Sequence, residues 1–184
     1  MPPAFFPVGL NLEGRDCIVI GRGDDREAIE KAAALEEAGA NVRWIREPQR
    51  LRDEDLSGAF FVISTPHDAQ LSKRLRTLAD RERFLLCCID QPAYGFVAMQ
   101  AIAKAGPARI TVSSGGVSPA VSKRWREAIQ DVLDEKFARF LGALRARRNS
   151  NRSLADPEER KQAGRDAAEG FDVQITVRYP EWFE

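Results

Sequence analysis

The sequence predicts an α/β fold in which parallel strands form a sheet of the doubly wound type. Between residues 17 and 89, short apolar runs alternate with segments whose apolar residues recur at helical spacing, a pattern typical of β-α-β units. Residues 84–89 are apolar throughout, as expected for a strand that helices cover on both faces. Ligands of such folds bind at the carboxyl ends of the strands, so we expect the functional residues there.

The first half of the chain contains the predicted strands of the sheet and two predicted helices. The first helix ends at Gly39, because glycine readily takes the left-handed conformation of a helix cap. For the second helix we expect Thr65 as the N-cap and Pro66 as the first residue, with leucines at helical spacing behind them. The strands are predicted at residues 17–20, 41–45, 59–64 and 84–89, with a polar connection at 46–55.

The second half of the chain changes in pattern after residue 92. Residues 109–113 alternate as an exposed or antiparallel strand, and a long helix with an apolar stripe is predicted at residues 118–148. Because that helix has too little partner surface of its own, we expect it to pack against a second copy of the chain. The other predictions are a mixed segment at 93–104, a linker at 149–153, a short helix at 156–170 and a strand-like tail at 171–184.

The composition excludes several classes of protein. The 28 basic and 28 acidic residues cancel, so the overall charge does not attract the chain to a nucleic-acid backbone. No window is apolar enough for a membrane span, and the N-terminus lacks a signal-peptide pattern. Cys17, Cys87 and Cys88 are typical of buried thiols in a reducing compartment. The sequence has no Cys-x-x-Cys pair, so it does not predict a metal site. We therefore expect a cytoplasmic protein with no resident metal, no membrane contact and no nucleic-acid partner.

The first candidate site is the turn after the first strand. Gly21 and Gly23 flank Arg22 between a strand and a helix, which is half of a dinucleotide fingerprint, because glycines let backbone amides approach a pyrophosphate. Asp24 and Asp25 follow, and their carboxylates would repel a pyrophosphate unless they turn away to cap the helix. We assign Gly21, Arg22, Gly23 and Asp24 to cofactor binding, with a tight turn without a ligand as the alternative.

The ends of the second and third strands supply further candidates. Glu47 lies about 20 residues past the glycines, where an acidic residue holds the ribose hydroxyls of NAD. Arg46 beside it would favour a 2′-phosphate instead, and both side chains are equally compatible with a solvated loop. Thr65 and His67 follow the third strand, so we assign them to the cofactor cleft, with a solvated position as the alternative for His67.

The fourth strand is followed directly by Asp90, in the sequence Ile89-Asp90-Gln91-Pro92. A carboxylate at the carboxyl end of a sheet strand lies where open α/β folds bind their ligands. Asp90 is therefore the candidate catalytic residue, either as a general base or as a group that orients a substrate pyrrole nitrogen. The alternative is a turn aspartate ahead of a proline.

A second polar loop lies between the strand at 109–113 and the long helix. Residues 113–119 read SSGGVSP, and hydroxyls, a glycine pair and unpaired amides at a helix start form a concavity that suits an anion. Positive charge is added on the first turns of the helix. A serine-capped corner is the alternative. The predicted substrate-binding residues are Ser113, Ser114, Gly115, Gly116, Lys123 and Arg124.

These residues resemble the precorrin-2 dehydrogenase and sirohydrochlorin ferrochelatase module of siroheme synthases. The matches run in order over roughly residues 5–148, and the most specific is the SSGGVSPA loop at 113–120. The others include IVIGRG at 18–23, LEEAGA at 35–40, DLSGAFFVI at 55–63 and IDQP at 89–92.

The resemblance implies a Rossmann-like NAD-binding domain at residues 1–92, a dimerisation segment exchanged between two subunits at 93–130, and a mostly helical C-terminal region with an extended tail at 131–184. It implies a homodimer that oxidises the tetrapyrrole precorrin-2 to sirohydrochlorin with NAD, and insertion of Fe²⁺ as a second activity. In the family, the aspartate at Asp90 serves both reactions and the serine at Ser114 lies in the tetrapyrrole site.

Two departures from the family pattern fall on the nucleotide half of the site. Arg22 interrupts a run of glycines, with Asp24 and Asp25 as an insertion, and the stretch at 41–54 is shorter than in the family. Residues 41–48 therefore correspond either to the ribose-binding strand or to a later part of that stretch. These departures keep two alternatives open: a tetrapyrrole chelatase or carrier that has lost NAD binding, and a non-catalytic dimeric sensor.

Overall fold

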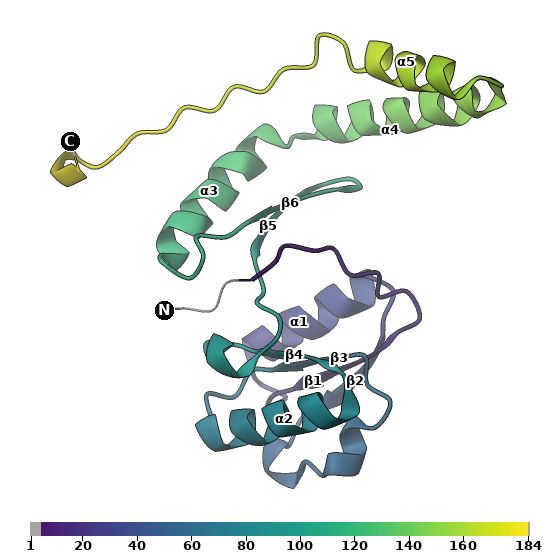
Figure 1. Ribbon diagram of the computed structural model, residues 1–184. Helices are drawn as coiled ribbons and strands as arrows, with labels where there is room; N and C mark the ends of the chain where they lie inside the picture. The colour runs from purple at the N-terminus through teal and green to yellow at the C-terminus, as the bar shows by residue number, and fades with distance from the viewer. Residues whose placement is uncertain (1–4, 184) are drawn as a thin grey trace. The chain divides into compact units, whose positions relative to one another are not determined.

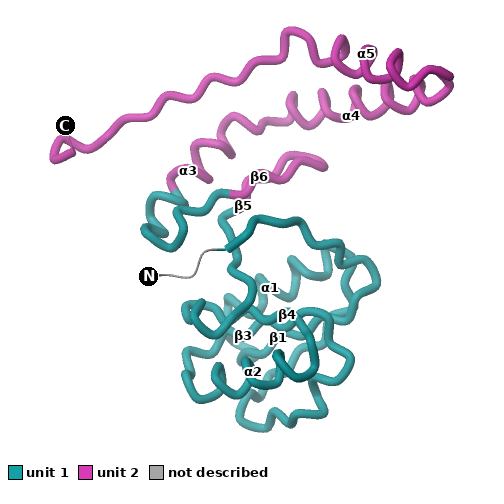
Figure 2. Tube along the Cα trace, viewed as in Figure 1, with its two compact units in different colours: residues 1–101, 112–123 teal, residues 102–111, 124–184 magenta. Residues whose placement is uncertain are grey.

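The computed structural model describes residues 5–183 and divides into two compact units (Figures 1 and 2). The first unit, residues 1–101 and 112–123, is built on one sheet. Its strands are β1 (Asp16–Ile20), β2 (Asn41–Ile45), β3 (Phe61–Ser64) and β4 (Leu85–Cys88), in the order β2-β1-β3-β4 and all parallel. The predicted α/β class with a parallel Rossmann-like sheet is confirmed.

The helices α1 (Arg26–Glu37) and α2 (Ala69–Glu82) cover opposite faces of this sheet (Figure 1). Successive side chains of a strand point to opposite faces, and β1 follows this rule. Val19 belongs to the core cluster that includes Ala32 of α1, whereas its neighbour Ile20 belongs to the cluster that includes Leu75 of α2. Both faces of the central strands are therefore buried, which explains why the strand sequences are apolar without interruption.

The first residues of α2 differ from the prediction. The helix begins at Ala69, and Asp68 is its N-cap, because the Asp68 carboxylate accepts hydrogen bonds from the amides of Gln70 and Leu71 at 2.9 and 3.0 Å. The predicted cap Thr65 instead continues from β3, and its amide donates to the Ile20 carbonyl at 3.0 Å. The predicted end of α1 is confirmed, since Gly39 has a φ of 82°.

The second unit comprises residues 102–111 and 124–184. It contains most of a hairpin, β5 (Ala101–Ala105) and β6 (Ala108–Val112), and the helices α4 (Glu135–Ser150) and α5 (Pro157–Ala167). The helix α3 (Pro119–Val132) begins in the first unit and ends in the second. Short 3₁₀ turns occur at η1 (Pro48–Arg50), η2 (Asp53–Leu56), η3 (Pro92–Tyr94), η4 (Asn151–Ser153) and η5 (Glu181–Phe183). The predicted division at residues 92 and 130 stays a prediction.

The predicted helix at 118–148 is wrong in its continuity. Asp134 is extended, with φ −81° and ψ 179°, and its carboxylate accepts the amide of Phe137 at 2.7 Å. This capping ends α3 and starts α4, because a side-chain acceptor at an N-cap satisfies an amide that a continuous helix would have bonded to a carbonyl.

Three other predictions for this half are corrected. The mixed segment at 93–104 contains most of β5, and the linker at 149–153 is the end of α4 followed by η4, where the Ser150 hydroxyl donates to the Ala146 carbonyl at 3.2 Å. The tail forms no strand within the described residues, because a strand requires a neighbouring ladder and none pairs with it. Its first residue, Phe171, stacks on Phe140 of α4 with ring centroids 5.2 Å apart.

The cysteines are free and buried, as predicted. Burial raises the pKa of the Cys87 thiol to about 11, and it also raises the pKa of Cys17 and Cys88. These thiols are protonated at neutral pH and contribute to the core as small apolar groups. Across residues 5–183, no helix is both long and apolar enough to cross a membrane.

We predict that Leu75→Ala destabilises the first unit strongly. Leu75 is fully buried where α2 meets the sheet, so the truncation removes apolar contacts and leaves a cavity, at a cost of about 2–5 kcal/mol. Urea denaturation followed by circular dichroism measures the loss. Ile29→Ala on α1, where 47% of the side chain is exposed, serves as the control and should change the unfolding free energy by about 0.5 kcal/mol or less. Equal effects of the two substitutions would contradict the described core.

Candidate functional site

The carboxyl ends of β1 to β4 meet at one edge of the sheet, because the strands are parallel. The loops at this edge carry the predicted cofactor residues and Asp90. Since β1 and β4 both flank β3, the glycine turn and Asp90 emerge from strands about 10 Å apart. That spacing brings a nucleotide loop and a candidate acid or base within reach of one extended ligand.

Gly21 at the end of β1 has no room for a side chain. A Cβ at this position would overlap the Thr65 hydroxyl, would come within 2.8 Å of the Ala28 Cβ, and would lie 3.3 Å from Asp25 Oδ2. Glycine is therefore required here so that β1, β3 and the start of α1 can approach one another. The Gly21 amide donates to the Ile45 carbonyl at 3.1 Å, so this amide is engaged within the sheet.

The two aspartates after the glycines are both turned to partners within the chain. Asp25 is the N-cap of α1, and its carboxylate accepts from the Glu27 amide at 2.9 Å and from the Thr65 hydroxyl. The Asp24 carboxylate forms a two-point contact with the Arg22 guanidinium, at 2.9 and 2.7 Å, which lowers the pKa of Asp24 and raises that of Arg22. A pyrophosphate is tolerated here only if the carboxylates turn away to cap the helix. Asp25 does so, whereas Asp24 is paired with Arg22 instead of capping the helix.

The turn keeps features that suit a dinucleotide. Among the described residues, the Gly23 amide makes no hydrogen bond. A Cβ at Gly23 would have only the Arg46 side chain near it, at 3.5 Å. This free amide lies just before the N-terminus of α1, whose partial positive charge stabilises an anion. The residues of the turn therefore fit the pyrophosphate of a nicotinamide dinucleotide.

A cavity of about 390 Å³ lies beside this turn, within the size range of small-molecule sites. The glycine turn contributes Arg22 and Asp25 to its wall, and the loop after β2 contributes Pro48 and Gln49. The wall combines apolar side chains with a few polar ones, as small-molecule sites commonly do. The remaining lining residues come from the segment that leads into α2: Pro66, Asp68, Gln70, Leu71 and Arg74.

The end of β2 lies next to the glycine turn. Residues 41–45 pair with β1 from Asp16 opposite Asn41 to Ile20 opposite Ile45, so they take the place of the ribose-binding strand rather than of a later segment. The Trp44 indole NH donates to the Gly21 carbonyl at 2.8 Å. The Arg46 guanidinium lies 4.8 Å from the centroid of the Trp44 ring.

Glu47, the predicted ribose ligand, is drawn to a neighbour. Arg50 Nε lies 2.9 Å from Glu47 Oε2 in an ion pair, and both side chains are exposed. Glu47 also lies outside the lining of the cavity, although Pro48 and Gln49 belong to it. Its assignment to the ribose stays a prediction that requires the ion pair to open.

The two candidates after β3 have different surroundings. Thr65 is half-buried and bonded to Asp25, so it positions the helix cap beside the glycine turn. His67 is exposed in the loop ahead of Asp68 and is not in the first turn of a helix as predicted, because that helix begins later. Its neighbours Pro66 and Asp68 line the cavity, but His67 does not.

Asp90 has a strained backbone. Its φ is 57°, and among the described residues only Arg83 is another non-glycine residue with a positive φ. Such a conformation costs an aspartate free energy and occurs often at functional sites. The neighbouring amides hold it in place, since Ile89 donates to the Ser64 carbonyl at 2.9 Å and Gln91 donates to the Cys88 carbonyl at 3.2 Å. The Asp90 side chain is exposed and has no partner among the described residues.

The loop at 113–118 differs from the expectation of unpaired amides. The Ser114 amide donates to Ser122 Oγ at 3.0 Å, the Gly115 amide to Ser113 Oγ at 3.1 Å, and the Ser118 amide to Ser114 Oγ at 3.0 Å. The Ser114 hydroxyl in turn donates to the Ser118 carbonyl at 2.9 Å. Serine hydroxyls satisfy nearby amides readily, so the loop is a tightly bonded corner in which few donors remain for an anion.

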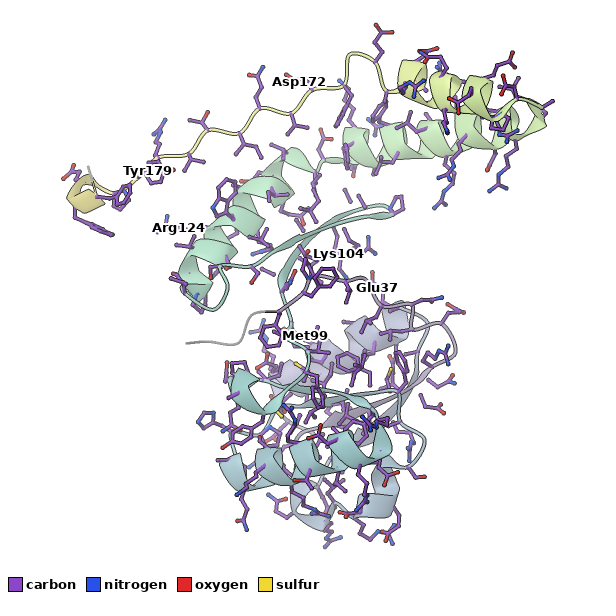
Figure 3. All side chains as sticks on the ribbon, viewed as in Figure 1. Glu37, Met99, Lys104, Arg124, Asp172 and Tyr179 are labelled. Atoms are coloured by element: carbon purple, nitrogen blue, oxygen red, sulfur yellow. The ribbon has the colours of Figure 1, made fainter. Side chains whose placement is uncertain are left out.

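Positive charge beside this loop is available. Lys123 and Arg124 on the first turns of α3 are exposed and make no ion pair within the described residues, and Figure 3 shows Arg124 projecting from that helix. Gly115 and Gly116 both have a positive φ, 64° and 80°, which explains the glycine pair in the sequence. The assignment of this loop and its cations to substrate binding stays a prediction.

Sequence reasoning missed two contributors to this site. Trp44 was predicted only as a strand residue, although its indole NH ties β2 to the glycine turn. Arg74 reaches the cavity from α2, where Asp53 and the Leu51 carbonyl hold it at 2.5 and 3.1 Å. A tryptophan two residues before an arginine, at the end of a strand, was the available signal for the first. Nothing in the local sequence signals the second.

Known proteins are similar to this chain over most of its length. The siroheme synthases of Salmonella typhi and Salmonella paratyphi B are each 29% identical to it over 163 residues, which cover 77% of this chain and 35% of each relative. The chain thus spans about a third of the length of these relatives. The solved structure titled SirC, precorrin-2 dehydrogenase, matches with a TM-score of 0.74 and 19% identity, and the match covers 90% of both chains. The predicted resemblance is confirmed as a similarity in sequence and in fold.

A family of proteins described as putative NAD(P)-binding matches residues 8–101. This segment contains the whole parallel sheet, the glycine turn and Asp90. It supports a nicotinamide dinucleotide as the cofactor and does not distinguish NAD from NADP. Because the match covers more than half of the 184 residues, the chain belongs to this putative NAD(P)-binding family.

Proposed function

We propose that the chain oxidises precorrin-2 to sirohydrochlorin with a nicotinamide dinucleotide, as a step in siroheme biosynthesis. The names of its relatives, siroheme synthase and precorrin-2 dehydrogenase, support this choice of substrate. The observation that carries the proposal is Asp90, a strained residue with an unpaired carboxylate at the same sheet edge as the glycine turn.

The reaction removes a hydride and a proton from the tetrapyrrole. When bound, the nicotinamide ring accepts the hydride. The free Gly23 amide and the N-terminus of α1 hold the pyrophosphate. Asp90 accepts the proton or orients the pyrrole nitrogen that releases it, since its carboxylate has no competing cation.

The substrate carries several carboxylates, so it requires cations. Lys123 and Arg124 supply them, because neither is neutralised by a neighbour. The bonded corner at 113–118 then sets the position of α3 more than it supplies donors.

The proposal extends to a homodimer in the cytoplasm and to Fe²⁺ as a second substrate. Metal insertion needs a base for the protons of the pyrrole nitrogens, and Asp90 is the candidate for that role as well. The tetrapyrrole nitrogens are the metal ligands in this reaction. The sequence predicted NAD as the dinucleotide, and the residues that decide between NAD and NADP lie at the end of β2.

The main test follows precorrin-2 absorbance with the purified full chain and NAD or NADP. We expect oxidation that depends on the dinucleotide, with reduced nicotinamide formed in equal amount and detected by its absorbance. Calorimetric titrations with each dinucleotide and with sirohydrochlorin measure the two halves of the site separately.

Each other result selects a different function. Tetrapyrrole binding without any nucleotide binding would reject the dehydrogenase and leave a chelatase or carrier. Binding of neither ligand would leave only a non-catalytic dimeric sensor.

We predict that Asp90→Gly abolishes turnover without destabilising the chain. Glycine relieves the positive φ at residue 90, so the free energy of unfolding should stay constant or rise by up to about 1 kcal/mol. Steady-state kinetics and urea denaturation measure the two effects.

Arg83→Gly is the matched control, because Arg83 also has a positive φ, 66°, but only ends α2. This variant should gain about as much stability and keep full activity. Turnover that persists in Asp90→Gly would refute the assignment of Asp90.

We predict that replacing both Lys123 and Arg124 by alanine weakens sirohydrochlorin binding about tenfold or more, since two charge-assisted contacts are lost. The loss should shrink as salt is added. The control replaces Arg147 and Arg148, a similar exposed pair on α4, and should leave the affinity unchanged. Equal losses for both pairs would show that only the net charge of the chain matters.

A further inference from the structure

We propose that Ser72 and Gln91 are positioning residues for Asp90, because the hydrogen bond between their side chains ties the Asp90 turn to α2. The inference rests on the role that the proposed function gives to Asp90, and it adds the groups that hold this aspartate in place. Asp90 follows β4 closely and has a φ of 57° and an exposed side chain. Such a conformation persists only where the surrounding structure enforces it, so the contacts that enforce it belong to the site.

Ser72 is a fully buried residue of α2, on the same face of the helix as the core residues Leu75 and Ala79. A hydroxyl in such a place costs free energy unless it is hydrogen-bonded. The Ser72 hydroxyl donates to Gln91 Oε1 at 2.5 Å, although Gln91 lies 19 residues further along the chain, beyond β4. This bond therefore accounts for a polar residue at a core position of the helix.

The Ser72 hydroxyl also meets the last residue of β4. Burial raises the pKa of the Cys88 thiol, and a hydrogen bond with the Ser72 hydroxyl opposes that rise. One buried group thus joins α2, the end of β4 and the loop that follows it. Removing this group would leave the polar atom of Gln91 without its partner, so the loop would lose its link to the helix.

Gln91, the residue directly after Asp90, is held at three points. Its amide donates to the Cys88 carbonyl at 3.2 Å, its carbonyl accepts from the Tyr94 amide at 3.1 Å, and its side chain accepts from Ser72. On the other side of Asp90, the Ile89 amide is bonded within the sheet at 2.9 Å. Both neighbours of Asp90 are therefore fixed, and its backbone cannot relax to a negative φ without breaking one of these bonds. Side-chain hydrogen bonds of this kind keep a functional group in its productive geometry.

A second link between α2 and the same loop lies further from Asp90. The Arg76 guanidinium lies 3.9 Å from the centroid of the Phe96 ring, and the Phe96 amide donates to the Leu86 carbonyl at 2.8 Å, where the loop returns to β4. This link supports the return of the loop rather than the turn at Asp90. It therefore offers a control for the effect of loosening the loop in general.

The test follows precorrin-2 oxidation by the purified full chain in steady state, for Ser72→Ala and for Gln91→Met, which keeps the length of the side chain but removes its acceptor. Each variant should lower kcat about tenfold or more, because a small misplacement of a reacting group is enough to slow the chemical step. The KM for the dinucleotide should stay within about twofold of the original, since the glycine turn follows β1. The double variant should be no slower than either single variant, because both remove the same bond.

Two control variants separate positioning from a general loss of structure. Ser64→Ala removes an equally buried serine hydroxyl that has no hydrogen-bond partner within the described residues, and Arg76→Ala removes the other link to the loop. Both should keep kcat within about twofold of the original. Circular dichroism measures the folded fraction to which each kcat refers. Amide hydrogen exchange, which needs no turnover, should become faster at residues 89–91 in Ser72→Ala and stay unchanged there in Ser64→Ala.

The outcomes separate the inference from the proposal beneath it. An unchanged kcat in Gln91→Met, or an equal fall of kcat in Ser64→Ala and Ser72→Ala, would overturn the positioning role while the dehydrogenase stands. Losses that multiply in the double variant would overturn it as well, because the two side chains would then not act through one bond. If the unaltered chain does not oxidise precorrin-2, the proposed function fails and the positioning role fails with it.

Discussion

The site depends on the close approach of three segments at Gly21. The end of β1, the residue after β3 and the first turn of α1 meet there, and the absence of a Cβ is what lets Thr65, Ala28 and Asp25 converge. This close approach lets the Thr65 hydroxyl bond to Asp25, the N-cap of α1, and so sets the direction in which α1 leaves the sheet. A side chain at residue 21 would separate the elements that define the nucleotide loop before it affected any ligand.

The same contact governs the electrostatics of the turn. Two aspartates follow the glycines, and an isolated pair of carboxylates would repel a nucleotide. Asp25 is turned to the amide of Glu27 and Asp24 to Arg22, so the negative charges are met locally. In this arrangement the positive charge of Arg22 is balanced by Asp24 within the turn itself.

The sequence predicts the strands of the sheet and the positions of the candidate site residues, but not all of their side-chain partners. Uninterrupted apolar runs such as FLLCCI at 84–89 identify buried strands, since only strands covered on both faces are apolar at every position. The turn residues and Asp90 follow from their place directly after those runs.

The features that the sequence did not predict depend on which of several similar polar groups forms a given hydrogen bond. Thr65 and Asp68 are both good caps, and the structure uses Asp68 because Thr65 is engaged by Asp25 from a distant part of the chain. Asp134 divides a segment that has an unbroken helical periodicity. The serine-rich loop supplies both donors and acceptors, and in the folded chain they bond to one another. Local pattern fixes the elements, whereas competition among capping groups is decided by tertiary contacts.

The two halves of the site are built on different physical grounds. The nucleotide half gains its precision from neighbouring strands, because the backbone hydrogen bonds between β1, β2 and β3 fix the spacing of the loops that follow them. Trp44 extends this rigidity outward by linking a side chain of β2 to the backbone of the glycine turn. Asp90 lies in the turn after the edge strand β4 and is held in a costly conformation by only a few amide contacts. A residue kept in such a conformation, with its carboxylate unpaired, gives the fold nothing that glycine would not give, so the proposed role of this carboxylate accounts for the cost better than stability does.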